Sequence, residues 1–361
     1  MTIALVNRFV PPDGAPTAVS LARLGRLLVK RLPSLDWRLI GVGRSYAGGG
    51  ASGENLWRRA ANSWRDGRRL AQEAANCSAV LSLTDPPFLS YHLGRQLSAD
   101  QFWCEWTMDL YPQALTAMLG LTPSPPCRPR RRPPDMRLCL GPRQAAFIAA
   151  GEQRPPPFLI CPAGVCDALL PPPPRKSENP IRLVYAGNLG RAHWDDALPE
   201  LARLSDPTRF RLLVAAYGVR AKAVRTKLMG FSHVEWRDTP LNADELNAAD
   251  VHVVSLRKNW THVCAPSKAV SALCRGRPLL FFGAANADAW KWANGAGWRI
   301  DPCRDAARRM LPAVLAELLV PERLNAFTER AMIAGEKLRA VESDAADVLA
   351  ERLSEHIGCR L

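Results

Sequence analysis

The chain has 361 residues, more than one ordinary hydrophobic core holds, and this length suits two domains. Its hydrophobic fraction of 47% and charged fraction of 23% are typical of globular proteins and exclude a disordered or fibrous chain. The 48 basic residues outnumber the 34 acidic ones by 14, so nucleic acid, anionic lipid and phosphorylated substrates all stay open as partners.

The ten cysteines contain no C-x-x-C pair and no zinc-finger spacing with histidine, so we expect no metal site. Reduced thiols fit a cytosolic protein. The opening ten residues are too poor in apolar side chains for a signal peptide or a membrane span. We therefore expect a cytoplasmic protein, at most held peripherally at the inner face of the cell membrane.

The first half of the chain alternates short apolar runs with helical periodicity. The apolar, β-branched run at residues 2–6 predicts a buried strand that opens into a turn-rich loop. A helix is expected at 17–32, where apolar residues recur at helical spacing among arginines. Further strands are expected at 37–41, 79–83, 101–106 and 158–161. This alternation predicts a parallel, doubly wound sheet.

The second half repeats the pattern after four consecutive prolines at 171–174, which form a stiff, extended linker. Strands are expected at 181–185, 210–215, 234–236, 251–256 and 278–282, and residues 311–361 are helical by pattern. The predicted divisions are an N-terminal Rossmann-like domain, a proline-rich linker, a C-terminal Rossmann-like domain and a helical segment, at residues 1–172, 173–180, 181–325 and 326–361.

The loop after the strand at 181–185 is the first candidate ligand site. Gly187 and Gly190 let the backbone approach a phosphate, and Arg191 follows directly to neutralise its charge. A strand-to-helix turn that needs glycine only for its backbone angles explains the loop equally well. A dinucleotide-binding oxidoreductase is disfavoured, because no segment supplies G-x-G-x-x-G after the first strand.

The second candidate is the sequence Pro266-Ser267-Lys268, which reads as a helix start with Ser267 as the N-cap. An anion could bind the free amide groups there. Lys268 in the first turn opposes the helix dipole, and this placement favours function modestly over surface decoration. His252 lies inside a predicted strand and is expected to be a core residue.

Several segments in order resemble family-four glycosyltransferases of the GT-B fold, especially the bacterial exopolysaccharide and O-antigen branch. The resembling segments are 7–15, which reads N-x-F-x-P-P-D-G-A, then 109–112, 185–191, 249–252, 266–268 and 276–278. The resemblance implies two doubly wound α/β domains facing each other across a cleft. It also implies transfer of a sugar, with retention of configuration and without a metal or other cofactor.

The resemblance implies particular partners and residues. The donor would be a nucleotide sugar, usually UDP-linked, and the acceptor a lipid-linked or other saccharide in cell-surface polysaccharide synthesis. Catalytic roles fall on Asp109, Arg191 and Lys268. Substrate-binding roles fall on Gly14, Gly187, Asn188, Gly190, His193, Pro266, Ser267 and Ser271.

Two departures from the family keep alternatives open. Ser271 stands where many relatives carry an acid for the ribose hydroxyls, and Asp109 stands near the place of a histidine that relatives often carry. A helix cap explains Asp109 nearly as well. One alternative is therefore a protein that binds nucleotide sugars without turnover. A nucleic-acid-binding protein is less favoured, because no nucleic-acid-binding motif occurs.

Two basic segments suggest an anionic membrane surface as a further partner. Trp57 and Trp64 lie seven residues apart among arginines, on one face of a predicted helix. Packing of both tryptophans inward is the simpler alternative. Residues 120–137 are rich in proline and arginine and are expected to form a mobile basic loop.

Overall fold

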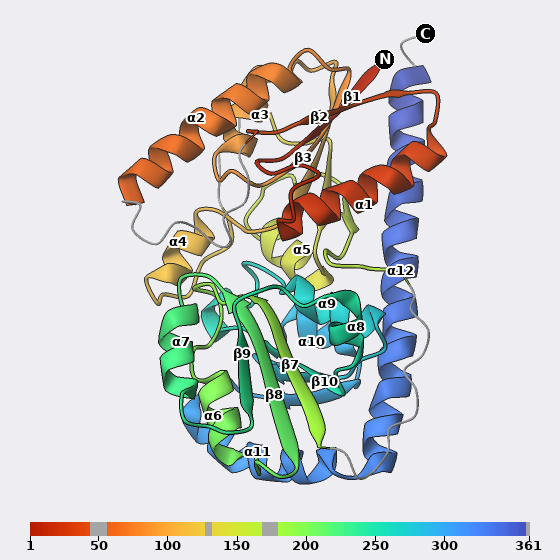
Figure 1. Ribbon diagram of the computed structural model, residues 1–361. Helices are drawn as coiled ribbons and strands as arrows, with labels where there is room; N and C mark the ends of the chain where they lie inside the picture. The colour runs from red at the N-terminus through yellow and green to blue at the C-terminus, as the bar shows by residue number, and fades with distance from the viewer. Residues whose placement is uncertain (44–55, 127–131, 168–179, 359–361) are drawn as a thin grey trace. The chain divides into compact units, whose positions relative to one another are not determined.

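The computed structural model describes residues 1–43, 56–126, 132–167 and 180–358, and the chain divides into two compact units (Figure 1). The described residues of the N-terminal unit are 1–43, 56–126, 132–163 and 340–358. Those of the C-terminal unit are 164–167 and 180–339. The predicted linker, 173–180, lies outside the described residues except for residue 180.

A parallel sheet, six-stranded within the described residues, lies at the centre of the N-terminal unit, in the order β2-β1-β3-β4-β5-β6. Every residue of β3 and β4 is buried, as is typical of parallel strands covered on both faces. The strands are β1 (Thr2–Val6), β2 (Asp36–Ile40), β3 (Ala79–Leu83), β4 (Phe102–Thr107), β5 (Met136–Cys139) and β6 (Phe158–Ile160).

Helices connect these strands. The first begins with a proline in its first turn, where no amide donor is needed, and ends with Lys30 and Arg31, which complement the helix dipole. Its buried face carries Leu21, Leu24 and Leu28. The helices are α1 (Pro16–Arg31), α2 (Leu56–Ala74), α3 (Leu89–Gln96), α4 (Gln113–Met118) and α5 (Pro142–Ala149).

The C-terminal unit contains a second parallel sheet, also six-stranded within the described part, in the order β12-β11-β10-β7-β8-β9. Its strands are β7 (Ile181–Asn188), β8 (Phe210–Tyr217), β9 (Val234–Arg237), β10 (Val251–Ser255), β11 (Leu279–Phe282) and β12 (Gly297–Ile300). The helices are α6 (Ala197–Leu204), α7 (Ala221–Leu228), α8 (Ala243–Asn247), the 3-10 turn η1 (Lys258–Trp260), α9 (Ser267–Cys274), α10 (Asp288–Ala293) and α11 (Arg304–Leu318).

The core of the C-terminal unit joins one face of its sheet to two helices. Leu183, Leu212 and Phe282 from the strands are buried together with Leu201 of α6 and Leu311 of α11. The order of connection reverses between β7 and β10: the chain runs from β7 outward through β8 and β9, and then crosses back to β10 on the other side. Loops therefore diverge there, at the place where open α/β sheets bind ligands.

The last helix, α12 (Pro321–Gly358), belongs to both units, because its residues from Ala340 onward group with the N-terminal unit. Arg23 of α1 donates from Nε to Glu342 Oε2 at 2.6 Å, and only 3% of the Glu342 side chain is exposed. Ala346, Leu349 and Leu353 are buried on the same stretch of helix. The N-terminal unit is thus completed by residues from the end of the chain.

The predicted fold class is confirmed: both units are doubly wound, Rossmann-like α/β domains. The cleft between them stays a prediction. The expected strands are present, but β5 and β12 had no sequence prediction. The expected helical stretch 311–361 is two helices, α11 and α12. Within the described residues, no helix combines the length and apolar character needed to span a membrane.

Replacing Glu342 by alanine is expected to destabilise the protein by about 3 kcal/mol, because it removes a buried carboxylate that accepts a hydrogen bond from the partly buried Arg23 guanidinium. Urea unfolding followed by circular dichroism measures this change. Asp347→Ala is the matched control: it removes a helix carboxylate that also pairs with an α1 arginine, Arg31, but is 60% exposed. Equal unfolding curves for the two variants would contradict the prediction.

Candidate functional site

The candidate site lies at the carboxyl ends of β7 and β10. The chain leaves β7 through Leu189–Asp196 and leaves β10 toward α9, so the two loops meet at the reversal of strand order. His193 of the first loop joins them: its Nδ1 lies 2.6 Å from the backbone oxygen of Ser255, the last residue of β10. A second hydrogen bond joins the two loops: the backbone amide of Arg257 donates to the backbone oxygen of Ala192 at 2.8 Å.

Lys268 in the first turn of α9 reaches across to the end of β7. Its Nζ donates to the hydroxyl of Tyr185 at 2.8 Å and to the backbone oxygen of Asn188 at 3.1 Å. The ammonium group also lies 4.1 Å from the centroid of the Tyr185 ring. Burial lowers the pKa of Lys268 to about 7, because the charged form loses hydration.

Gly187 leaves the space that this lysine occupies. Its φ of +109° lies in the left-handed region that favours glycine, and a Cβ there would lie 3.9 Å from both Cε and Nζ of Lys268. A larger side chain would have to displace the ammonium group. The positive φ therefore requires glycine at this position, and the Lys268 side chain packs against it at van der Waals distance.

Asn188 and Gly190 complete the loop. The Asn188 side chain packs against Gly218 (φ +106°), where a Cβ would lie 2.1 Å from Oδ1, and its Nδ2 lies 3.5 Å from the Cβ position of Gly190. Asn188 Oδ1 is buried and has no hydrogen-bond partner among the described residues. The two glycines thus admit the Asn188 side chain between adjacent loops.

The helix start differs from the prediction. Pro266, with φ −60° and ψ 109°, is the N-cap, and Ser267 is the first helical residue and makes no capping hydrogen bond. The prediction that Ser267 is the N-cap was therefore wrong. Pro266 is the last residue with extended backbone angles, and its side chain has no oxygen to accept a hydrogen bond from the first helical amides. The Ser267 backbone instead packs against Gly164, whose positive φ of +93° permits this approach.

His193 is buried, and burial, reinforced by the nearby Lys268 charge, holds its pKa well below the usual value. Because a carbonyl oxygen only accepts, the short contact to Ser255 requires the proton on Nδ1 and leaves Nε2 as an acceptor. His193 is therefore a neutral group that can accept a hydrogen bond.

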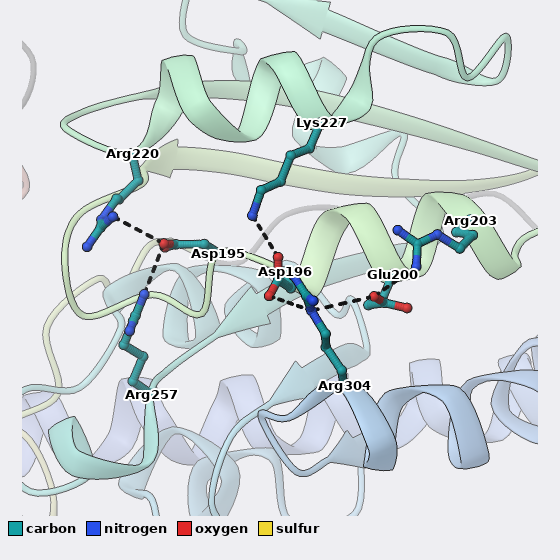
Figure 2. A network of polar contacts seen from close by, with 8 residues as sticks. All are labelled: Asp195, Asp196, Glu200, Arg203, Arg220, Lys227, Arg257 and Arg304. Atoms are coloured by element: carbon teal, nitrogen blue, oxygen red, sulfur yellow. Dashed lines mark hydrogen bonds and ion pairs between the residues drawn. The ribbon is translucent and has the colours of Figure 1, made fainter. Parts of the chain in front are cut away.

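Arg191 is exposed and makes no hydrogen bond or ion pair with a described residue. Two further arginines lie beside the same loop. Arg257 donates from Nε to the backbone oxygen of His193 at 2.8 Å, and it pairs with Asp195 at 3.0 Å. Arg220 pairs with the same carboxylate at 3.4 Å, as Figure 2 shows. One carboxylate shared by two guanidinium groups leaves the loop with excess positive charge.

Sequence reasoning missed Tyr185, Asp195, Arg220, Ser255 and Arg257 as contributors. The sequence positions of the two arginines could have identified them. Arg220 follows the end of β8 by three residues and Arg257 follows the end of β10 by two, at the edge of the sheet where ligands bind. Their pairing with Asp195 is a tertiary contact that spacing does not reveal. His252 is the buried core residue that was predicted, with Nε2 bonded to the oxygen of Leu246 at 3.0 Å.

Ser271 lies one turn after Lys268 on α9 and already has a partner. The Arg275 guanidinium hydrogen-bonds to Ser271 Oγ and, at 3.1 Å, to its backbone oxygen. A second neighbour, Cys166, lies 3.3 Å from the same guanidinium nitrogen. At the position where an acid was expected, the structure therefore has a serine bound to a cation.

Gly14 and Asp109 belong to the N-terminal unit. Gly14 is exposed, with open space where a Cβ would lie. Asp109 is exposed and does not cap α4, whose N-cap is Pro112, so the cap alternative is wrong. Asp109 lies near Asp85, whose pKa burial raises to about 6, with the Arg8 charge opposing and the Asp109 charge adding to this shift.

Among the residues that the structure describes, no group of three or more histidine, cysteine, aspartate or glutamate side chains is arranged to hold a metal ion. The site therefore offers cations, backbone amides and a neutral imidazole. This combination suits an anionic ligand with additional hydroxyl groups.

No family model and no curated protein sequence matches the chain. Solved structures do match over nearly the whole length. WaaG, a glycosyltransferase involved in lipopolysaccharide biosynthesis, is 17% identical with a TM-score of 0.63, over 96% of this chain and 99% of that one. WaaB, a lipopolysaccharide outer core galactosyltransferase in its apo form, is 13% identical with a TM-score of 0.55, over 100% of both chains.

A third match is the E. coli structure described as trehalose-6-phosphate bound with UDP-2-fluoro glucose. It is 12% identical with a TM-score of 0.57, over 95% of this chain and 98% of that one. These similarities show that the chain has the GT-B fold of two Rossmann-like domains.

Lys268→Met is expected to change the pH dependence of stability. The unfolded chain keeps the lysine proton up to about 10.4, whereas the folded protein releases it at about 7. Between these values the unfolded state binds more protons, so the stability of the wild type rises with pH relative to the variant. Thermal unfolding of both proteins from pH 6 to 10 measures this difference.

The control is Lys222→Met, which replaces an exposed lysine of α7. Its difference from the wild type is expected to stay constant across the same pH range. A parallel pH response of the wild type and Lys268→Met would show that Lys268 does not titrate in this window.

Proposed function

We propose that the protein is a glycosyltransferase that moves a sugar from a nucleotide sugar, UDP-linked, to a lipid-linked or saccharide acceptor in cell-surface polysaccharide synthesis. The observation that carries the proposal is the Lys268 ammonium group held over Gly187 at the reversal of strand order. Retention of anomeric configuration is part of the proposal and follows the family resemblance. The proposed localisation of the protein is cytoplasmic.

The diphosphate of the donor is assigned to the loop 187–191 and the start of α9. Negative charge grows on a departing diphosphate as its bond to the sugar breaks, so nearby cations stabilise the transition state. Lys268 and Arg191 supply this charge, and the α9 amides supply hydrogen-bond donors. We propose that these groups suffice without a metal ion.

The other residues have assigned roles in the same donor. His193, neutral and buried, accepts a hydrogen bond from a sugar hydroxyl through Nε2. Ser271, whose Oγ accepts a hydrogen bond from Arg275, is assigned to the nucleoside side of the donor, at the position where a carboxylate was expected. Asp109 and Gly14 are assigned to the acceptor. The UDP-2-fluoro glucose bound in the similar E. coli structure supports a UDP-linked donor. The lipopolysaccharide roles of WaaG and WaaB support a saccharide or lipid-linked acceptor.

A surface on α2 and α3 suits the anionic membrane that would present a lipid-linked acceptor. Trp64 is 43% and Tyr91 44% exposed, and their rings lie 5.4 Å apart. The exposed arginines around them are Arg58, Arg65, Arg68, Arg69 and Arg95. The Trp57 side chain and residues 127–131 of the predicted basic loop lie outside the described residues. Exposed aromatics among arginines favour the membrane-interface interpretation of α2.

Loss of either diphosphate cation is expected to weaken UDP binding by about 10- to 100-fold, the effect of one charged hydrogen bond. Isothermal titration calorimetry with UDP tests Arg191→Ala and Lys268→Met. Arg182→Ala, an exposed arginine at the opposite end of β7, is the matched control and should bind like the wild type.

Uridine, which lacks phosphate, should bind all these proteins equally. Failure of UDP, GDP and their sugars to bind the wild type would end the nucleotide-site proposal. Binding without product formation in the presence of membrane extract would instead identify a nucleotide-sugar-binding protein without turnover. Turnover that chelation of divalent metals abolishes would contradict the metal-free mechanism.

Charge reversal of Arg58, Arg65 and Arg68 to glutamate is expected to lower affinity for phosphatidylglycerol-containing vesicles by about 100-fold or more, because each surface arginine contributes about 1 kcal/mol. Vesicle flotation at low and high salt measures binding. The control variant reverses three exposed arginines of the C-terminal unit, Arg209, Arg309 and Arg323. Equal losses in both variants would assign the effect to net charge and contradict a specific surface.

A further inference from the structure

Two cysteines of the C-terminal unit lie against one face of α9. Cys166 is half-buried, and its Sγ lies 3.8 Å from the backbone oxygen of Ser271 and 3.3 Å from Nη1 of Arg275. Cys274, between these two contact residues on the helix, is buried, and its Sγ lies 3.9 Å from the oxygen of Gly335. Ser271, Cys274 and Arg275 share one face of α9 by helical spacing, so the Cys166 sulfur, which contacts the first and the third of these residues, lies on the helix face that carries Cys274.

The surroundings give the two sulfurs different roles. A guanidinium group within 3.3 Å stabilises negative charge on the Cys166 sulfur, and this residue is the more accessible of the two. The neighbouring Cys166 thiol and burial raise the pKa of Cys274, so Cys274 stays a thiol. One sulfur is therefore suited to attack an oxidant and the other to react in a second step.

Two cysteines of the N-terminal unit have a different environment. Cys104 and Cys161 are buried, and burial raises their pKa values well above the usual value, which is typical of inert core thiols. Cys303 is the exposed cysteine of the described part of the chain and serves as an internal reference. Cys166 and Cys274 are distinguished by a cation beside one sulfur and by a second thiol on the same face of α9.

We propose that Cys166 and Cys274 form an oxidation site that reacts with hydrogen peroxide to give a disulfide. The Cys166 thiolate attacks one peroxide oxygen, the O–O bond breaks, and the released hydroxide takes up a proton to become water. Cys166 is then a sulfenic acid. Cys274 loses its proton and attacks the Cys166 sulfur; the S–S bond forms, the S–O bond breaks, and a second water leaves. Two electrons pass from the sulfurs to the peroxide.

The site adjoins the proposed donor site through α9, which carries both Lys268 and Cys274. Disulfide formation removes the Cys166 thiol from Arg275, which also holds Ser271. Weaker UDP binding by the oxidised protein is therefore expected, and this consequence rests on the proposed function. Disulfide formation itself is measured without any nucleotide, so the two proposals fail separately.

The test treats the reduced full-length protein with hydrogen peroxide, blocks remaining thiols with an alkylating reagent, and maps peptides by mass spectrometry. A disulfide-linked peptide pair containing Cys166 and Cys274 is expected, reversed by dithiothreitol. It should be lost in Cys166→Ser and Cys274→Ser and retained in Cys303→Ser. Arg275→Gln should slow its formation about tenfold, as expected for a thiolate fraction reduced by one pKa unit.

Three outcomes would overturn the proposal: Cys166 stays reduced after Cys303 has reacted, Cys166 proceeds to sulfinic acid without a cross-link, or it pairs with another cysteine. The wild-type peptide map decides among these even where a serine variant fails to fold. Circular dichroism of each variant identifies such a failure.

Discussion

The donor site depends on one cation that joins two elements of the C-terminal unit. Lys268 comes from α9 and its ammonium group is held by the Tyr185 hydroxyl and the Asn188 carbonyl at the end of β7. Gly187, which packs against this lysine, is required because its φ of +109° lies in the left-handed region. The same charge helps to keep His193 neutral. Lys268 thus joins α9 to the end of β7, adds to the effect of burial on the His193 pKa, and supplies positive charge at this edge of the sheet.

The fold was largely predictable because parallel strands are buried on both faces. Strands such as β3, β7 and β10 are therefore apolar runs that stand out in the sequence. β5 had no sequence prediction because it is four residues long, directly follows the proline- and arginine-rich stretch, and contains Arg137. That arginine is buried only because Glu105 and Glu152 pair with it from other segments, at 3.3 and 2.9 Å. β12 begins at Gly297, with a positive φ, and likewise contains an arginine.

The candidate site was predictable where its residues are close in sequence. Gly187, Asn188, Gly190 and His193 lie in one loop, and strand-to-loop spacing identified them. Their partners come from distant segments, as Ser255 does for His193. The error at Ser267 has a local cause, since a single backbone angle at Pro266 decides where α9 begins. Periodicity predicts which residues share an element, whereas side-chain partners depend on tertiary packing.

The shared helix α12 has a consequence for how the protein is made. Glu342 and the buried Leu349 and Leu353 belong to the N-terminal unit, although they are synthesised after all the residues of the C-terminal unit. During synthesis the first sheet must therefore wait, with part of its apolar surface uncovered, until the second unit has been translated. Folding of the two units cannot proceed as independent steps in chain order. Arg23 gains its carboxylate only after the C-terminal unit and the first half of α12 have been synthesised.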